Sequence, residues 1–291
     1  MPQAFERHRG AAASIRHIAA HEFGRALAAV DGAAENPADA VHEVRQRLKR
    51  LRALIRLARG HFAGFSAENI ALRDLGRQLA TTREADVLGE TLDKLAEAAG
   101  IAPPSTLRAA LIAAHLGRSD EAVEASLLRK VRQGLGQARL RAADWHFSAA
   151  GFDLIGPGIE ATFRAMRSAG LTATAQTDAL HLHEWRKQVK HHAIQLRYLR
   201  PVAPDWLGPR RDIADALADL LGEHHDLDML KAALRDLPVE QGDGTGPVIA
   251  TIEARSTTLE IEAFRLRDLL GDETPKLFRQ RLEDAWRDWR D

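Results

Sequence analysis

The sequence contains no cysteine, which excludes disulfide bonds and thiolate metal ligands. Aromatic residues make up only 5% of the chain, a composition that favours long helices over sheets. No apolar run approaches the roughly 18–20 residues of a membrane span, and the N-terminal MPQAFERHRG lacks the apolar core of a secretory signal. We therefore expect a cytoplasmic protein without a membrane partner.

Net charge is also absent, because 41 basic residues balance 41 acidic ones. General attraction to a polyanion is not available, so only local segregation of charge can create a surface for an acidic ligand. Two segments are strongly basic. Residues 37–60 hold seven Lys and Arg against two Asp and Glu, and residues 178–200 hold five against two, together with four histidines.

The first basic segment predicts an amphipathic helix over residues 38–59, with Asn36-Pro37 as its start signal and Gly60 at its end. At about 100° per residue, one imidazole and four cations fall within a stripe about 80° wide. The stripe consists of His42, Arg45, Lys49, Arg52 and Arg56. Apolar side chains lie largely on the opposite side and can pack into a core. Because neighbouring like charges repel on a helix, the stripe indicates a binding partner.

The same pattern returns 141 residues later, in LHEWRKQVKHHAIQLRYLR at 182–200. The second stripe consists of His183, Arg186, Lys190 and Arg197. Only Arg52 lacks a basic counterpart, since the matching position is Ala193. A pattern that recurs in order at a nearly fixed offset indicates an internal duplication.

An acidic pattern follows each basic helix and supports the duplication. It reads LATTREADVL at 79–88 and LGEHHDLDML at 221–230, an offset of 142. The matched acidic pairs are Glu84 with Asp226 and Asp86 with Asp228. We expect Asp86 and Asp228 to orient the basic stripes through salt bridges or helix contacts.

The fold class predicted from these patterns is all-α, because no strand-like alternation of convincing length occurs. Helices are expected at 7–30, 38–59, 66–99 (one helix or a broken pair), 105–116, 119–145, 158–169, 178–200, 205–236, 248–270 and 275–290. Glycine and proline at 147–158 predict a boundary there, and the glycine-rich 242–247 is expected to be a linker. The duplication thus predicts two helical bundles, residues 1–150 and 151–291.

The side chains of the stripes suit oxyanions. Arginine offers a planar fork of donors, lysine a compact charge, and histidine a donor whose charge depends on pH. A row of such groups at turn spacing fits a ligand with repeating negative charges better than a single phosphate. A solvated amphipathic helix would explain one stripe, but two matched copies with a histidine at the same place favour a binding site.

The leading alternative is a metal-dependent phosphohydrolase of the helical HD type. Its metal ligands would be His224, His225, Asp226 and Asp228. The aligned position in the first half holds Arg83-Glu84, which cannot repeat such a dyad. The chain also lacks the HExxH and G-x-S-x-G patterns. We predict no catalytic residue, no metal site and no cofactor.

Nucleic-acid binding is a third hypothesis. Single strands are usually bound by aromatic side chains interleaved with basic ones, and the basic helices offer only Trp185 and Tyr198. The apolar reverse face of each stripe also indicates a helix built into a bundle. Nucleic acid is therefore disfavoured as a partner.

The strings HEVRQRLKRLR and HEWRKQVKHHAIQLRYL, each followed by its acidic segment, resemble the CHAD family of conserved-histidine α-helical domains. The resemblance implies two helical bundles related by pseudo-twofold symmetry, with basic residues lining a shared surface. It implies non-enzymatic binding of inorganic polyphosphate, association with polyphosphate granules, and granule-associated proteins as further partners. The family's binding positions fall on His42, Arg45, Lys49, Arg52, Arg56, His183, Arg186, Lys190 and Arg197. Because Ala193 and Glu160-Ala161 depart from the family's basic pattern, we expect the first half to contribute more binding energy.

Overall fold

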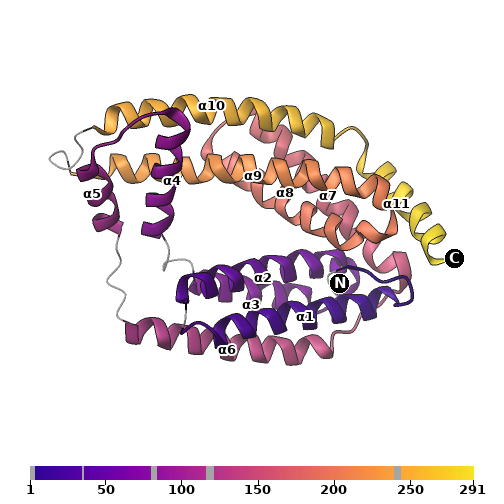
Figure 1. Ribbon diagram of the computed structural model, residues 1–291. Coiled ribbons are helices and arrows are strands. Elements are labelled where there is room, and N and C mark those ends of the chain that lie inside the picture. The colour runs from indigo at the N-terminus through magenta and orange to yellow at the C-terminus, as the bar shows by residue number, and fades with distance from the viewer. Residues whose placement is uncertain (1–3, 35, 80–83, 116–120, 239–243) are drawn as a thin grey trace.

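The computed structural model describes residues 4–34, 36–79, 84–115, 121–238 and 244–291 (Figure 1). Side chains are described for the same residues except 84–86, 115 and 121–125. The elements are α1 (Ala11–Asp31), α2 (Pro37–Leu57), η1 (Arg59–His61), α3 (Phe65–Gln78), α4 (Glu84–Ala99), α5 (Ser105–His115), α6 (Glu121–Ala143), α7 (Gly151–Ala175), α8 (Ala179–Leu199), η3 (Arg200–Val202), α9 (Pro204–Arg235), α10 (Thr245–Leu270) and α11 (Pro275–Arg290). No strand occurs in these ranges, and the predicted all-α fold is confirmed.

Helix starts follow the capping chemistry of the sequence. The Asn36 side chain accepts a hydrogen bond from the backbone N–H of Asp39, and proline occupies the first helical position of α2. The Asp178 side chain caps α8 in the same way by accepting from the N–H of His181. Both basic helices therefore begin at a side-chain cap. The expected segment 66–99 is a broken pair, α3 and α4.

Two groups of helices make up most of the molecule. Helices α1, α2, α3 and α6 pack on one another, and α7 to α11 form the other group (Figure 1). They meet mainly where α2 contacts α7 and α8. One apolar cluster runs through both groups and includes Leu51 and Ile55 of α2 with Ile159 of α7 and Leu196 of α8. The pseudo-twofold relation and the division at residue 150 stay predictions.

Helices α4 and α5 belong to the first half of the sequence but pack against the second. Figure 1 shows them beside α9 and α10, away from α1, α2 and α3. A separate apolar cluster holds them there, in which Leu88 and Leu92 of α4 pack with Leu227 of α9 and Ile252 of α10. This crossing, which the duplication does not predict, brings residues of α4 to a cavity that the basic helix α8 also lines.

The predicted helix start at residue 158 is wrong, because α7 begins at Gly151 and continues through Pro157 to Ala175. The helix expected at 158–169 is correspondingly longer. The glycine at 158 serves close packing instead of a turn: a Cβ built there would lie 2.0 Å from the carbonyl oxygen of Leu57. Absence of a side chain thus lets α7 approach the end of α2.

Buried polar contacts fix α2 against α8. The Gln195 side chain donates from Nε2 to the carbonyl oxygen of Ala53 at 3.0 Å, and the Tyr198 hydroxyl lies 3.3 Å from the carbonyl oxygen of Arg50. Both side chains are almost fully buried. Buried polar groups require such partners, so these two bonds favour one relative placement of the basic helices.

Candidate anion-binding site

Two cavities are lined in part by neighbouring positions of α8, and each contains part of a predicted stripe. The first, called here the basic cavity, has a volume of about 450 Å³ and is formed by α2, α3 and α8. It is lined by Arg45, Leu48, Lys49, Arg52, Leu72, Arg73, Gly76, Arg77, His183 and Lys187. None of these lining residues is acidic. The basic cavity therefore offers cations from three helices to one space.

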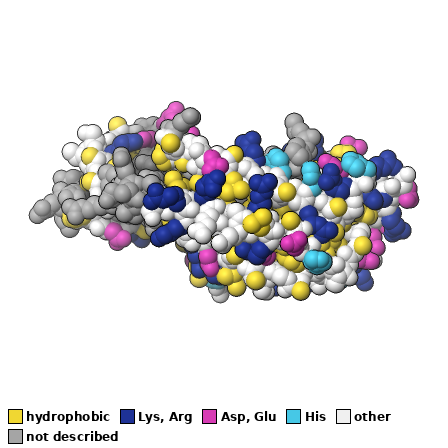
Figure 2. Space-filling view, turned by 90° about the horizontal axis from the view of Figure 1, so that it is seen from below, with side chains coloured by type: hydrophobic (Ala, Val, Ile, Leu, Met, Phe, Trp, Pro, Cys, Tyr) yellow, Lys and Arg dark blue, Asp and Glu magenta, His cyan; other side chains and the backbone are white. Residues whose placement is uncertain are grey.

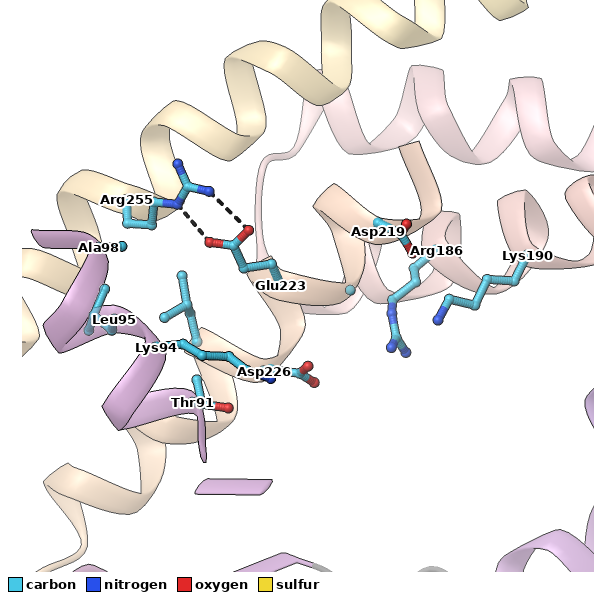
Figure 3. Close-up of a pocket in the computed structure, with 12 residues that line it drawn as sticks. Thr91, Lys94, Leu95, Ala98, Arg186, Lys190, Asp219, Glu223, Asp226 and Arg255 are labelled. Atoms are coloured by element: carbon cyan, nitrogen blue, oxygen red, sulfur yellow. Dashed lines mark hydrogen bonds and ion pairs between the residues drawn. The ribbon is translucent and has the colours of Figure 1, made fainter. Parts of the chain in front are cut away.

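The second space, called here the mixed-charge cavity, has a volume of about 480 Å³ (Figure 3). It is lined by Thr91, Lys94, Leu95, Ala98, Arg186, Lys190, Asp219, Gly222, Glu223, Asp226, Leu227 and Arg255. Figure 3 shows the side chains of Arg186 and Lys190 close to each other on α8, with Asp226 on α9 facing the same space. The two cavities share α8 but differ in the charge of the opposing wall.

Two guanidinium groups of the basic cavity are oriented by hydrogen bonds. Arg45 donates from Nη1 to the carbonyl oxygen of Leu79 at 3.1 Å, and Arg52 donates from Nε to Oδ1 of Asn69 at 3.1 Å. A guanidinium carries five N–H donors in a fixed plane, so a contact at one of them sets the direction of the others. Fixed, oriented forks are what bidentate recognition of phosphate requires.

The ammonium group of Lys49 lies close to other cations of the two basic helices. Its ammonium is reached by solvent but is crowded by protein atoms. Burial, followed by repulsion from Lys190 and Arg186, lowers the pKa of Lys49 from 10.5 to about 8. Burial is also the first cause that lowers the pKa of Lys190. An anion placed between these ammonium groups would relieve the repulsion.

The predicted histidine of the second stripe is part of a pair of tilted rings. The rings of His183 on α8 and His225 on α9 lie with centroids 4.4 Å apart. Burial lowers the pKa of both, followed by nearby Lys187 for His183 and by Arg186 for His225, whose pKa falls to about 4. Both rings are therefore neutral near pH 7. Nδ1 of His183 is buried and has no hydrogen-bond partner within the described chain, so this ring nitrogen is an unused polar group beside the basic cavity.

Arg186 carries a second unused donor. Its Nε is buried without a hydrogen-bond partner among the residues described, although Asp219 and Asp226 line the same cavity. Burial lowers the pKa of Arg186, while those two carboxylates act in the opposite direction. Leaving a buried guanidinium donor unpaired costs free energy, which a bound oxyanion would recover.

Three predicted residues line neither cavity. His42 is exposed, and its Nε2 lies 2.6 Å from Nε2 of Gln46. Arg197 pairs with Asp215 of α9 at 3.6 Å. Arg56 lies further along α2, where burial and then Arg52 lower its pKa to about 10. The structure thus gathers Arg45, Lys49, Arg52, His183, Arg186 and Lys190 at the two cavities and leaves these three at the margins.

Other cavity residues were not expected from the sequence. They are Arg73, Arg77, Lys94, Lys187 and Arg255. The four-residue spacing of Arg73 and Arg77 places both on one face of α3, a signal that could have been read. Lys187 aligns with Gln46 of the first half. A search for positions at which the second repeat gains a charge would have found it.

The second acidic segment does not act as predicted. Asp226, not Asp228, faces the basic residues of α8. Asp228 lines a different cavity, between α9 and α10, together with His224. The reason is helical geometry, since positions two residues apart project about 200° apart around the axis. The side chains of Glu84 and Asp86 lie outside the described residues.

The ligand set of the phosphohydrolase alternative is divided by the same geometry. His224 lies against Glu260 of α10, with Nε2 and Oε1 3.0 Å apart, whereas the ring of His225 contacts that of His183 at an interplanar angle of 40°. Over the described side chains, no three His, Asp or Glu residues lie close enough together to hold a metal ion. Likewise, no helix in the described ranges is long and apolar enough to cross a membrane.

One outer face of the molecule carries charges of both signs. Figure 2 shows Lys and Arg side chains distributed over this face and interspersed with Asp, Glu and His. Mixed charges are expected for a chain with no net charge. The lining of the basic cavity differs from this face, because it contains Lys, Arg and His and no acidic residue.

Comparison with known proteins agrees with this arrangement. A search of curated proteins found no match. The family model described as the CHAD domain matches residues 10–235, which include both basic helices and every element from α1 to α9. Helices α10 and α11 lie beyond the match. Because the model covers well over half of the chain, this protein belongs to the CHAD domain family.

Proposed function

We propose that this protein binds inorganic polyphosphate in the basic cavity and does not degrade it. The observation that carries the proposal is the composition of that cavity, where six of the ten lining residues are Lys or Arg and none is acidic. The family, which is linked to polyphosphate binding, supports the same ligand.

The spacing of the cations favours a chain of phosphates over a single one. Arg45, Lys49 and Arg52 extend over roughly 10 Å of α2, at 1.5 Å per residue. On the facing wall, Arg73 and Arg77 are one helical turn apart on α3. A linear polyanion can contact several of these groups at once, and each contact releases counterions.

Nucleic acid fits this site less well. Stacking of unpaired bases requires exposed aromatic rings. Trp185 and Tyr198, the aromatic residues of the basic helices, are each 1% exposed and are part of the apolar core. Binding to the basic cavity therefore depends on phosphate contacts alone, which suits a ligand without bases.

Location at polyphosphate granules follows if such chains are the ligand in the cell. The proposal predicts that a fluorescently tagged protein concentrates on granules and becomes diffuse when polyphosphate is depleted. Absence of enzymatic activity would be tested with long-chain polyphosphate and divalent metal. Unchanged chain length on gels is expected, and metal-dependent shortening would favour the phosphohydrolase alternative.

Charge reversal in the basic cavity tests the binding site directly. We expect Arg73→Glu with Arg77→Glu to weaken polyphosphate binding at least about 100-fold, because each charge-assisted contact contributes roughly 1.5–3 kcal/mol. The matched control is Arg129→Glu with Arg139→Glu, which makes the same charge change at exposed positions of α6. Titration calorimetry measures the affinities, and circular dichroism checks the fold. A folded cavity variant that binds as tightly as the control would refute this location.

A further inference from the structure

The wall opposite α8 has opposite charge in the two cavities. In the basic cavity it consists of α3, with Arg73 and Arg77. In the mixed-charge cavity α9 contributes Asp219, Glu223 and Asp226, while α4 contributes Lys94 and α10 contributes Arg255. An anion that binds along α8 would therefore meet only cations and neutral groups in the basic cavity, but would be repelled by the carboxylates of α9 in the mixed-charge cavity.

The duplication explains how this difference is encoded. The offset of 142 that aligns 79–88 with 221–230 also aligns Arg77 with Asp219 and Arg73 with Asp215. Corresponding positions of the repeat thus carry arginine in α3 and aspartate in α9. Of these two aspartates, Asp219 lines the mixed-charge cavity, whereas Asp215 pairs with Arg197 and Arg211. One change of charge sign therefore lies at the cavity wall.

Two of the three carboxylates on α9 are not used for structural ion pairs. Glu223 makes two hydrogen bonds with Arg255 of α10, at 2.6 and 3.0 Å. In contrast, no hydrogen bond or ion pair joins the side chain of Asp219 or Asp226 to another described residue, and both carboxylates act on Arg186 and Lys190 only through space. Their charge is therefore available to act on whatever enters the mixed-charge cavity.

We propose that Asp219 and Asp226 prevent bound polyphosphate from extending out of the basic cavity into the mixed-charge cavity, so that the site accepts a segment of limited length. This inference rests on the proposed function. Phosphates beyond the segment remain in solvent, which makes affinity nearly independent of chain length once the basic cavity is filled. The two carboxylates are thus specificity-determining residues that act by repulsion.

Repulsion between these carboxylates and bound phosphates is strong enough to change the affinity measurably. Like charges brought together at a binding surface are strongly unfavourable, and a cavity screens them less than open solvent does. The same carboxylates also offset part of the attraction of Arg186 and Lys190, which line the mixed-charge cavity beside them. Removing both negative charges would turn this cavity into an extension of the basic one.

The test replaces both residues by their neutral isosteres, Asp219→Asn and Asp226→Asn. We expect long-chain polyphosphate to bind about five- to tenfold more tightly, since an interfacial like-charge contact is costly and tenfold corresponds to 1.4 kcal/mol. The slope of log affinity against log salt should steepen by about one or two, because more phosphates are neutralised. A short chain that only fills the basic cavity should bind as it does to the natural protein.

The matched control is Asp212→Asn with Asp228→Asn, which removes two charges from the same helix. Asp212 is exposed beside Arg211, and Asp228 lines the separate α9–α10 cavity. This control should leave the affinities for both chains and the salt slope unchanged. If it tightens binding as much as the test variant, overall charge and not the position of the carboxylates is responsible, and the inference is wrong.

The remaining outcomes separate the inference from the proposed function. Natural protein that does not bind polyphosphate overturns both. Natural protein that binds, with a double variant that has the same affinity and salt slope, overturns only the role of Asp219 and Asp226. If the double variant does not fold, the single variant Asp219→Asn at an exposed position should still tighten long-chain binding, and its failure to do so would count against the inference.

Discussion

Raising the pH should weaken polyphosphate binding before any arginine titrates. The group responsible is Lys49, whose pKa in the free protein is lowered to about 8 by burial and by the cations around it. Lys190 is affected in the same direction. A bound polyanion stabilises the protonated form of both ammonium groups and raises their pKa.

The direction and the size of this pH effect follow from the thermodynamic linkage between protonation of Lys49 and polyphosphate binding. If binding restored the pKa of Lys49 from about 8 to its ordinary 10.5, the affinity would fall roughly 300-fold between those pH values. Because the Lys49 side chain is exposed to solvent, screening reduces this to about tenfold. Below pH 7 Lys49 is protonated in both states, so it contributes no pH dependence there. Between about pH 8 and 10.5 the bound protein retains a proton that the free protein loses, and affinity declines.

Calorimetry at several pH values, in buffers of different ionisation enthalpy, measures both the affinity and the protons taken up. The control is Lys49→Arg with Lys190→Arg, which keeps the charges and removes the titration, so its affinity should stay constant from pH 7.5 to about 10. The pKa of His183 is lowered by burial, so that ring titrates below neutrality and does not overlap with this window. An arginine variant that loses affinity with pH as steeply as the natural protein would refute the reasoning.

Two further predictions concern the margins of the site and the packing that supports it. Arg197→Ala should weaken polyphosphate binding by less than about twofold, because its pairing with Asp215 contributes little at the surface, whereas Arg52→Ala should weaken it about tenfold. Equal losses in titration calorimetry would contradict this difference. Gly158→Ala should lower the free energy of unfolding by about 2–3 kcal/mol, since its Cβ would collide with the carbonyl of Leu57. Gly136→Ala, where a Cβ meets nothing within 4 Å, should be neutral or slightly stabilising in the same urea titration.

The sequence by itself determined the helices and the helix faces that carry charge. Local signals were sufficient for this. Asn36 and Asp178 cap the two basic helices, and the apolar positions of both helices recur with the period of an α-helix. The duplication and the family resemblance were also readable, because they depend on order and spacing. Local signals gave the wrong start for the helix expected at residue 158. That helix, α7, begins at Gly151, and Gly158 allows it to pack closely on α2.

Tertiary structure alone decided which charged faces meet. Helical periodicity shows where a side chain projects, but it does not identify the helix that lies opposite. Arg73 and Arg77 entered the basic cavity because α3 packs beside α2, and α4 reached the mixed-charge cavity only because its leucines pack against α9. Asp226 faces that cavity and Asp228 does not, since a change of two positions turns a side chain to the far side of the helix. Stripes can be read from the sequence, whereas a site requires two or more of them to be packed against each other.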